Sequence, residues 1–211
     1  PIYVFCATET WLGEDSNQTC YDVDGFNLES VNSVQDRGAG AAVYIKIDTT
    51  FHIVKTDAKD DYEMICIFFP KISTMVATVY RHCNASLASF LHVPQCLLDI
   101  CKTNNIPRIV VLGDFNNSTG DISRSFLSLE FQQVIHSPTT IAGSTLDNIF
   151  ICNIPSFKSG VLSSYFSFHL PIYISINICE VQHVKAEKKK TSVKAEKKKT
   201  SVKANTKVQP I

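Results

Sequence analysis

Polar side chains that can do chemistry stand directly after short apolar runs in this sequence. There are five such blocks, which in chain order are Thr8-Glu9-Thr10-Trp11-Leu12, Val79-Tyr80-Arg81-His82-Cys83-Asn84, Gly113-Asp114-Phe115-Asn116, Ser144-Thr145-Leu146-Asp147-Asn148-Ile149-Phe150 and Ser167-Phe168-His169-Leu170-Pro171-Ile172. Layered α/β proteins place their chemistry where strands end and loops begin. Each block alone also has an ordinary explanation, since such residues are common in turns, caps and cores. The blocks are therefore informative as an ordered set.

The apolar runs before these blocks have the length and composition of β-strands, and Gly, Asn, Asp and Pro separate them. The predicted strands are Ile2–Ala7, Ala41–Lys46, Phe51–Lys55, Met64–Phe69, Met75–Tyr80, Ile109–Leu112, Leu146–Cys152 and Leu170–Ile178. Two helices are predicted, Ser86–Cys101 with an interruption near Pro94, and Ile122–Leu129. Continuous apolar runs such as Ile109–Leu112 indicate strands covered on both faces. The pattern predicts an α/β protein in which sheets pack together and helices lie outside.

The composition predicts one globular domain with an appended tail. The chain has 211 residues, of which 45% are hydrophobic and 19% charged, so there is room for one core. The nine residues Lys-Ala-Glu-Lys-Lys-Lys-Thr-Ser-Val occur twice in succession from Lys185. Such a tract has almost nothing to bury and is expected to be disordered. We therefore predict a domain over residues 1–181 and a Lys-rich tail over residues 182–211, either simply solvated or able to contact polyanions.

Charge and cysteine usage restrict the partners and the compartment. Ten Lys and two Glu lie from Lys185 onward, so this segment carries +8 and the rest of the chain −8. Nucleic-acid binding by the domain would therefore need a local basic patch, metal ions or the tail. The eight cysteines are scattered, without a C-x-x-C pair, which is typical of reduced thiols. Reduced thiols favour a reducing compartment, so we expect an intracellular protein, nuclear or cytoplasmic. No apolar stretch is long enough to cross a bilayer.

Taken in order, the five blocks resemble the signature of the endonuclease/exonuclease/phosphatase superfamily. The closest resemblance is to the endonuclease domains of non-LTR (LINE-type) retrotransposons and to related apurinic endonucleases. The Thr8–Leu12 block looks like their Glu-Thr-Trp block, and Arg37–Tyr44 looks like their Gly-rich approach to a strand. Pro138–Asp147 resembles their Pro-Thr-Arg lead-in, with Thr140 in place of Arg. The resemblance covers Pro1 to about Ile178 and implies a four-layer α/β sandwich, with two packed mixed sheets flanked by helices.

The resemblance also implies roles in hydrolysing a DNA phosphodiester. Glu9 would bind Mg²⁺, or alternatively Mn²⁺. Asp114 and Asn116 would position the attacking water, and His169, oriented by Asp147, would serve as acid/base and phosphate partner.

Four residues would contact the substrate phosphate by the same resemblance. Tyr80 and Asn84 would donate hydrogen bonds to it, and Asn116 and Ser167 complete the expected set. The whole hypothesis requires the side chains of these blocks to converge on one cavity.

Two departures from the family pattern are visible. The family begins one strand earlier, with an Asn that contacts phosphate, so the resemblance implies a domain that lacks its first strand and helix. Phe168 stands where the family has an aspartate that helps to hold the metal, and a phenyl ring cannot ligate a cation. Loss of one charged ligand costs about 3 kcal/mol, roughly a hundredfold in occupancy. We therefore expect weakened metal binding and weak or lost activity.

Three functions remain open at this point. The chain could be an active Mg²⁺-dependent DNA endonuclease, a non-catalytic relic that binds nucleic acid or protein, or a phosphatase that acts on a phosphoinositide or another phosphomonoester. The oligomeric state and any target-site preference are not indicated by the sequence.

Overall fold

The computed structural model describes residues 4–12, 18–32, 39–117 and 120–177. Internal contacts divide the chain into a first unit, Pro1–Ile154 with Lys158–Ser175, and a second, Pro155–Phe157 with Ile176–Ile211. The second unit is described only at residues 155–157 and 176–177, so the predicted tail over residues 182–211 lies outside the described residues. Within the described ranges, no helix combines the length and apolar character that a membrane span requires.

The larger sheet of the first unit has six strands in the order β4-β5-β6-β7-β9-β8. These strands are β4 (His52–Ala58), β5 (Tyr62–Phe69), β6 (Thr74–Arg81), β7 (Arg108–Asp114), β8 (Gln132–Gln133) and β9 (Asp147–Cys152). The sheet is mixed, because β6 and β7 are parallel while the other neighbours are antiparallel. The crossover from β6 to β7 contains the helices α1 (Leu87–Phe90) and α2 (Val93–Thr103), and α3 (Asp121–Leu127) follows β7.

Two smaller sheets complete the described fold. One has the antiparallel order β1-β3-β2, and the other is the pair β10-β11. Their strands are β1 (Val4–Thr8), β2 (Phe26–Val31), β3 (Ala41–Lys46), β10 (Phe157–Val161) and β11 (Ile172–Ile176). Two 3₁₀ turns, η1 (Gln18–Tyr21) and η2 (Pro70–Ile72), precede β2 and β6.

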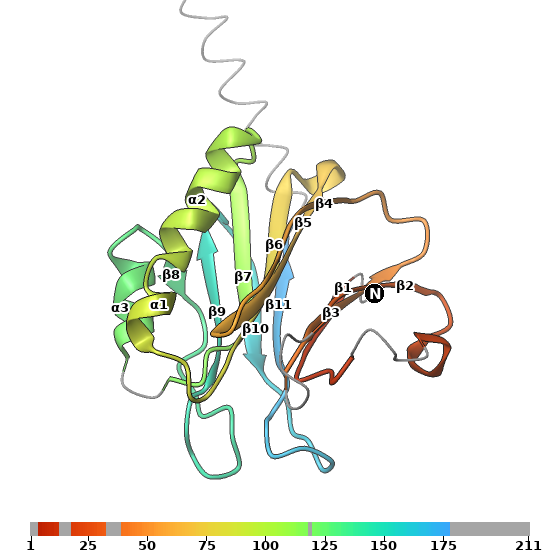
Figure 1. Cartoon of the computed structure of the whole chain (residues 1–211). Coiled ribbons are helices and arrows are strands. Elements are labelled where there is room, and N and C mark those ends of the chain that lie inside the picture. The colour runs from red at the N-terminus through yellow and green to blue at the C-terminus, as the bar shows by residue number, and fades with distance from the viewer. Residues whose placement is uncertain (1–3, 13–17, 33–38, 118–119, 178–211) are drawn as a thin grey trace, which may run out of the picture. The chain divides into compact units, whose positions relative to one another are not determined.

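Strand β5 shows how the layers are held together. Met64 and Cys66 belong to the apolar cluster that includes the buried side chains of α2 and α3. Ile65 and Ile67 belong to a second cluster with residues of β2 and β3. Because successive strand residues point to opposite faces, β5 is buried on both sides. Helices therefore cover one face of the six-stranded sheet and the three-stranded sheet packs on the other (Figure 1).

The predicted fold class is confirmed, with packed sheets and helices outside them. Every predicted strand has a counterpart, and β3 has the predicted bounds. The helix prediction placed the interruption near Pro94, whereas α1 ends at Phe90 and Pro94 lies in the first turn of α2. Proline is tolerated there, because the first backbone N–H groups of a helix have no intrahelical partner. Three strands, β2, β8 and β10, were not predicted. The described α-helices all lie on the six-stranded sheet.

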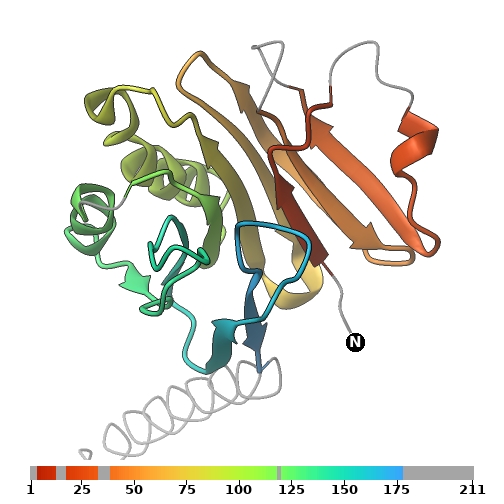
Figure 2. The same cartoon turned by 90° about the horizontal axis from the view of Figure 1, so that it is seen from below.

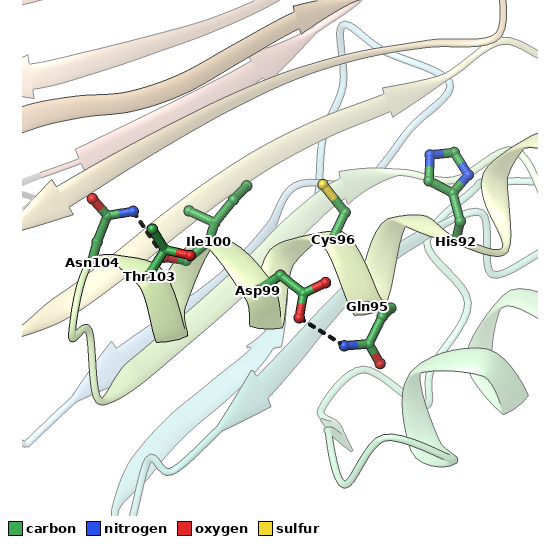
Figure 3. Close-up of a pocket in the computed structure, with 7 residues that line it drawn as sticks. All are labelled: His92, Gln95, Cys96, Asp99, Ile100, Thr103 and Asn104. Carbon is green, nitrogen blue, oxygen red and sulfur yellow. Dashed lines mark hydrogen bonds between the residues drawn. The ribbon is translucent and has the colours of Figure 1, made fainter.

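A shallow groove runs along the exposed side of α2 (Figure 3). Seven residues line it: His92, Gln95, Cys96, Asp99, Ile100, Thr103 and Asn104. Its polar side chains are partly engaged within the helix, since Gln95 Nε2 donates to Asp99 Oδ1 at 3.0 Å and Asn104 Nδ2 donates to the Ile100 carbonyl at 2.8 Å. None of the five polar blocks contributes to this groove.

Candidate functional site

Three candidate residues lie side by side in one row across the larger sheet. Tyr80 on β6 pairs with Asp114 on β7, and Asp114 pairs with Asp147 on β9. Side chains that pair in register point to the same face of a sheet. The row falls where β6 and β7 end and β9 begins. The strands themselves therefore bring together a phenol and two carboxylates from widely separated parts of the sequence.

Strand β7 requires a glycine at the position before Asp114. Gly113 precedes Asp114 and has φ +149°, and a Cβ atom added to it would lie 1.8 Å from the Val79 carbonyl oxygen. Any side chain here would push β6 away from β7. The close approach of the two strands, and hence of Tyr80 and Asp114, depends on Gly113.

His169 is brought to the same row by a loop. Its Nδ1 lies 2.8 Å from Asp147 Oδ2, and its Nε2 lies 3.9 Å from Asp114 Oδ2. The loop is tied to the 139–140 segment, because Leu170 N–H donates to the Thr139 carbonyl at 2.7 Å. Thr139 Oγ1 in turn accepts the N–H of Asp147 at 3.0 Å. One threonine therefore holds both the carboxylate strand and the histidine loop.

Glu9 joins the site from the smaller sheet. Its Oε1 accepts a hydrogen bond from the Tyr80 hydroxyl at 2.9 Å. Glu9 has φ 54°, so the chain turns sharply after β1. Trp11 N–H donates to the Ala39 carbonyl at 2.9 Å. Gly40 leaves room for this turn, since a Cβ on it would lie 2.6 Å from Thr10 Oγ1.

Asn116 is locked to the end of β6 by reciprocal hydrogen bonds. Its Nδ2 donates to the Arg81 carbonyl at 2.8 Å, and its backbone N–H donates to Asp114 Oδ1 at 2.8 Å. The buried Arg81 guanidinium donates to the Asn116 carbonyl at 3.2 Å, to the Phe115 carbonyl at 3.4 Å, and to the Ala85 carbonyl. Asn116 has φ 46°, a conformation that asparagine tolerates better than most residues. Arg81 thus holds the Asp114–Asn116 loop in place.

Solved structures share this architecture. No family model matches the chain, and no curated protein matches its sequence. A Bacteroides thetaiotaomicron protein described as an endonuclease/exonuclease/phosphatase family member is similar, with a TM-score of 0.51 and 16% identity over 71% of this chain and 74% of the other. The chain has the endonuclease/exonuclease/phosphatase fold. The 3′ phosphatase NExo from Neisseria, bound to a product DNA hairpin, is also similar, with a TM-score of 0.60 and 14% identity over 84% and 90%. The endonuclease domain of TRAS1, a telomere-specific non-LTR retrotransposon, has a TM-score of 0.56 and 13% identity over 74% and 80%.

The electrostatics of this cluster favour bound protons or cations. Burial and the neighbouring Asp147 charge raise the pKa of Asp114 to about 6. Burial also raises the pKa of Asp147, against the opposing effect of its hydrogen bond to His169. Partial burial lowers the pKa of His169, but the hydrogen bond and charge of Asp147 outweigh it, so that the pKa is raised. The carboxylates are therefore incompletely compensated by the protein itself.

Three of the gathered residues can ligate a metal ion. One ligand atom each from Asp114, Asp147 and His169 lie within 4.8 Å of one another. Glu9, the metal ligand implied by the resemblance, is not in this group, and its Oε1 holds the Tyr80 hydroxyl. Its charge nevertheless acts on both Asp114 and His169, so it lies at the same site.

Two of the residues expected to bind the substrate phosphate lie at the edge of the Asp114–Asp147–His169 cluster. Asn84 is exposed in the turn after β6, and among the described residues no hydrogen bond joins it to the cluster. Ser167 is also exposed, and its Oγ accepts the N–H of His169 at 3.1 Å. Phe168 is 49% exposed, and its ring packs edge-on against the His169 ring at 5.7 Å. The structure thus gathers Glu9 and His169 with the strand residues, and their chemical roles remain predictions.

Two residues contribute more to holding the site together than the sequence indicated. Arg81 stands in one of the polar blocks but was given no role there, whereas its side chain is buried and donates to carbonyl oxygens. Thr139 was seen only as part of the lead-in to Asp147. The position of Arg81 directly after Tyr80, at the end of a buried strand, was the only sequence signal for its burial.

Proposed function

We propose that this chain binds the phosphodiester backbone of DNA at the Asp114–Asp147–His169 cluster and hydrolyses it slowly with Mg²⁺. The observation that supports the proposal most directly is the register of β6, β7 and β9, which aligns Tyr80, Asp114 and Asp147 beside His169. This arrangement combines a base, an oriented imidazole and a hydroxyl donor within reach of one small anion.

The distance between His169 and Asp114 fits a bridging water. Their facing atoms are 3.9 Å apart, beyond a hydrogen bond, so a water between them can bond to both. Asp114 would accept the proton of the attacking water. His169, held by Asp147 with its Nε2 toward Asp114, would contact the phosphate and protonate the leaving oxygen.

The donor set fits a divalent cation. The carboxylates of Asp114, Asp147 and Glu9 are hard oxygen donors. The pKa of Asp114 is raised by burial first and then by the charge of Asp147, and a bound cation would neutralise part of that charge. When bound, Mg²⁺ would place positive charge on the phosphoryl oxygens as the leaving group departs. Mn²⁺ is compatible as well, because His169 adds an imidazole nitrogen to the donor set.

We further propose that the domain derives from a non-LTR retrotransposon endonuclease. The Glu-Thr-Trp block at Glu9 and the Gly-rich segment before β3 support this origin, together with the similarity of fold to the TRAS1 endonuclease domain. By this origin DNA is the substrate. NExo is a 3′ phosphatase, so hydrolysis of a phosphomonoester is an alternative reaction on the same scaffold.

Nicking of supercoiled plasmid by the full chain tests the proposal. We expect slow conversion to the open circle that requires Mg²⁺, is abolished by EDTA and falls below detection in His169→Ala. The matched control is His52→Ala, because His52 is an exposed histidine on the edge strand β4. Nicking that survives in His169→Ala, or that is lost equally in His52→Ala, would contradict the assignment.

Phe168 favours a second candidate, a DNA-binding relic without turnover. Its phenyl ring supplies no ligand where the resemblance implies a metal-site carboxylate, and it is exposed beside His169. Phe168→Asp separates the two candidates. If slow hydrolysis is limited by metal binding, this variant should nick plasmid faster and at lower Mg²⁺ concentration. DNA binding without nicking in both proteins would favour the relic.

A further inference from the structure

The segment that joins β10 to β11 exposes three aromatic rings. Tyr165 is 99% exposed, Phe166 is 90% exposed and Phe168 is 49% exposed. Exposed rings gathered on one loop are unusual, since large aromatic side chains normally bury most of their surface. We name residues 162–168 the aromatic loop. Exposed apolar surface of this kind is typical of a binding site.

The aromatic loop is anchored beside the candidate site. The Phe168 carbonyl accepts the N–H of Ile141 at 3.1 Å, and the N–H of Leu162 donates to the Pro171 carbonyl at 2.8 Å. His169 follows the loop directly and forms a β-bridge with Thr140. Figure 2 shows this loop, in blue, curving beside the end of the larger sheet. The rings therefore lie on a support that is fixed at both ends and continuous with His169.

The chemistry of the aromatic loop is that of a stacking surface. Residues 159–177 contain no Lys, Arg, Asp or Glu, so the segment has no fixed charge with which to hold a polyanion or an anionic membrane. The rest of the chain before Lys185 carries −8, which also opposes phosphate binding through its net field. At the aromatic loop itself, affinity for a nucleic acid must then come from contacts other than phosphate charge. Aromatic rings provide such contacts by stacking on bases.

We infer that Tyr165 and Phe166 stack on unpaired nucleobases of the strand whose phosphate occupies the candidate site. This inference rests on the proposed function and names its substrate class, DNA with single-stranded or unpaired nucleotides. In a duplex the faces of each base are already covered by neighbouring bases, so exposed rings have access only where the stack is open. In the sequence, Phe168 lies between His169, whose imidazole would face the phosphate, and the two outer rings of Tyr165 and Phe166.

Two labelled oligonucleotides of equal length distinguish base stacking from phosphate binding. One is oligothymidylate, and the other is an abasic strand with the same number of phosphates. Affinities are measured for the full chain by fluorescence anisotropy in EDTA, so that neither strand is cleaved. The Lys-rich tail contributes to both affinities alike, because phosphate contacts do not depend on bases. We expect the wild-type chain to bind oligothymidylate more tightly than the abasic strand, by about 5- to 150-fold for each stacked base.

The double substitution Tyr165→Ala/Phe166→Ala should reduce this ratio to about one, while Tyr21→Ala should leave it unchanged. Tyr21 is a matched control, because it is an exposed tyrosine in the 3₁₀ turn before β2. Equal affinity of the wild-type chain for the two strands would overturn the inference. So would a ratio that survives the double substitution, or loop-dependent binding to neutral phosphatidylcholine vesicles without a base preference.

Failure of the inference and failure of the proposed function give different results. Absence of Mg²⁺-dependent nicking by the wild-type chain contradicts hydrolysis and leaves the binding ratio measurable. Equal affinity for the two strands contradicts stacking and leaves the nicking assay intact.

Discussion

The strand-borne and the loop-borne parts of the site are positioned by different forces. Tyr80, Asp114 and Asp147 stand on three neighbouring strands, and the ladder between those strands fixes their separation. Glu9 and His169 stand on loops, and each is held by a few hydrogen bonds and local backbone constraints. A sheet distributes its register over many backbone bonds, whereas a loop depends on single contacts. We therefore expect the strand row of Tyr80, Asp114 and Asp147 to be lost only when the sheet is disrupted. The positions of Glu9 and His169 should change on single substitutions.

The largest expected effect comes from breaking the strand row at Gly113. Gly113→Ala places a methyl group against the Val79 carbonyl and should lower the free energy of unfolding by about 4 kcal/mol or more. Chemical denaturation measures the loss. Gly25→Ala is the matched control, because Gly25 also has positive φ but nothing within 4 Å of an added Cβ, so it should cost only about 1 kcal/mol. Equal losses in both variants would show that the strand contact is not the constraint.

The next effect tests how the strand row orients the loop histidine. Asp147→Asn keeps the side-chain shape but removes the negative charge beside His169 Nδ1, so it should lower the rate of plasmid nicking by about 10²- to 10⁴-fold. The surface variant Asp99→Asn on α2 should retain the wild-type rate. Retention of the rate in Asp147→Asn would mean that His169 needs no oriented partner.

A smaller effect is expected from Arg81, which ties the strand end to the Asn116 loop. Arg81→Lys loses part of the guanidinium bonding to backbone carbonyls and should cost about 1–3 kcal/mol of stability, with a fall in nicking rate. Arg108→Lys offers a comparison, since Arg108 bonds the Ile72 carbonyl at the other end of β7. Arg108→Lys should lower stability without changing the rate per folded molecule. A rate that falls equally in both would remove the special role of Arg81.

The smallest effect concerns the charge within the cluster. Asp114 has a folded pKa of about 6, above its ordinary 3.8, and the pKa values of Asp147 and His169 are raised too. Folding therefore favours the protonated forms, and the stability they contribute is present at low pH and lost as pH rises through the folded pKa values. The metal-free chain should lose about 1–2 kcal/mol of this contribution between pH 5 and pH 8. Mg²⁺ should raise the melting temperature more at pH 8 than at pH 5, as thermal denaturation can show.

Much of the fold followed from local patterns. The continuous apolar runs at Met64–Phe69 and Ile109–Leu112 predicted strands covered on both faces. The structure buries every residue of these runs except the half-buried Phe68 and Leu112. Strand β2, in contrast, has the sequence Phe-Asn-Leu-Glu-Ser-Val, whose polar residues hide its strand character. It is a strand because it pairs with β3 along its whole length. That pairing is a long-range property that no local window contains.

The sequence by itself determined the set of candidate residues, since the order of the polar blocks at strand ends identified Glu9, Asp114 and His169 before any coordinates. Only the tertiary structure decided what Arg81 and Phe168 do. The Arg81 side chain is buried and donates hydrogen bonds to carbonyl oxygens, whereas the Phe168 ring is exposed beside the His169 imidazole. Residue type and spacing specify which chemistry is available. Burial and hydrogen-bond partners arise from segments distant in the chain, and these decide whether a given side chain holds the site together or faces a ligand.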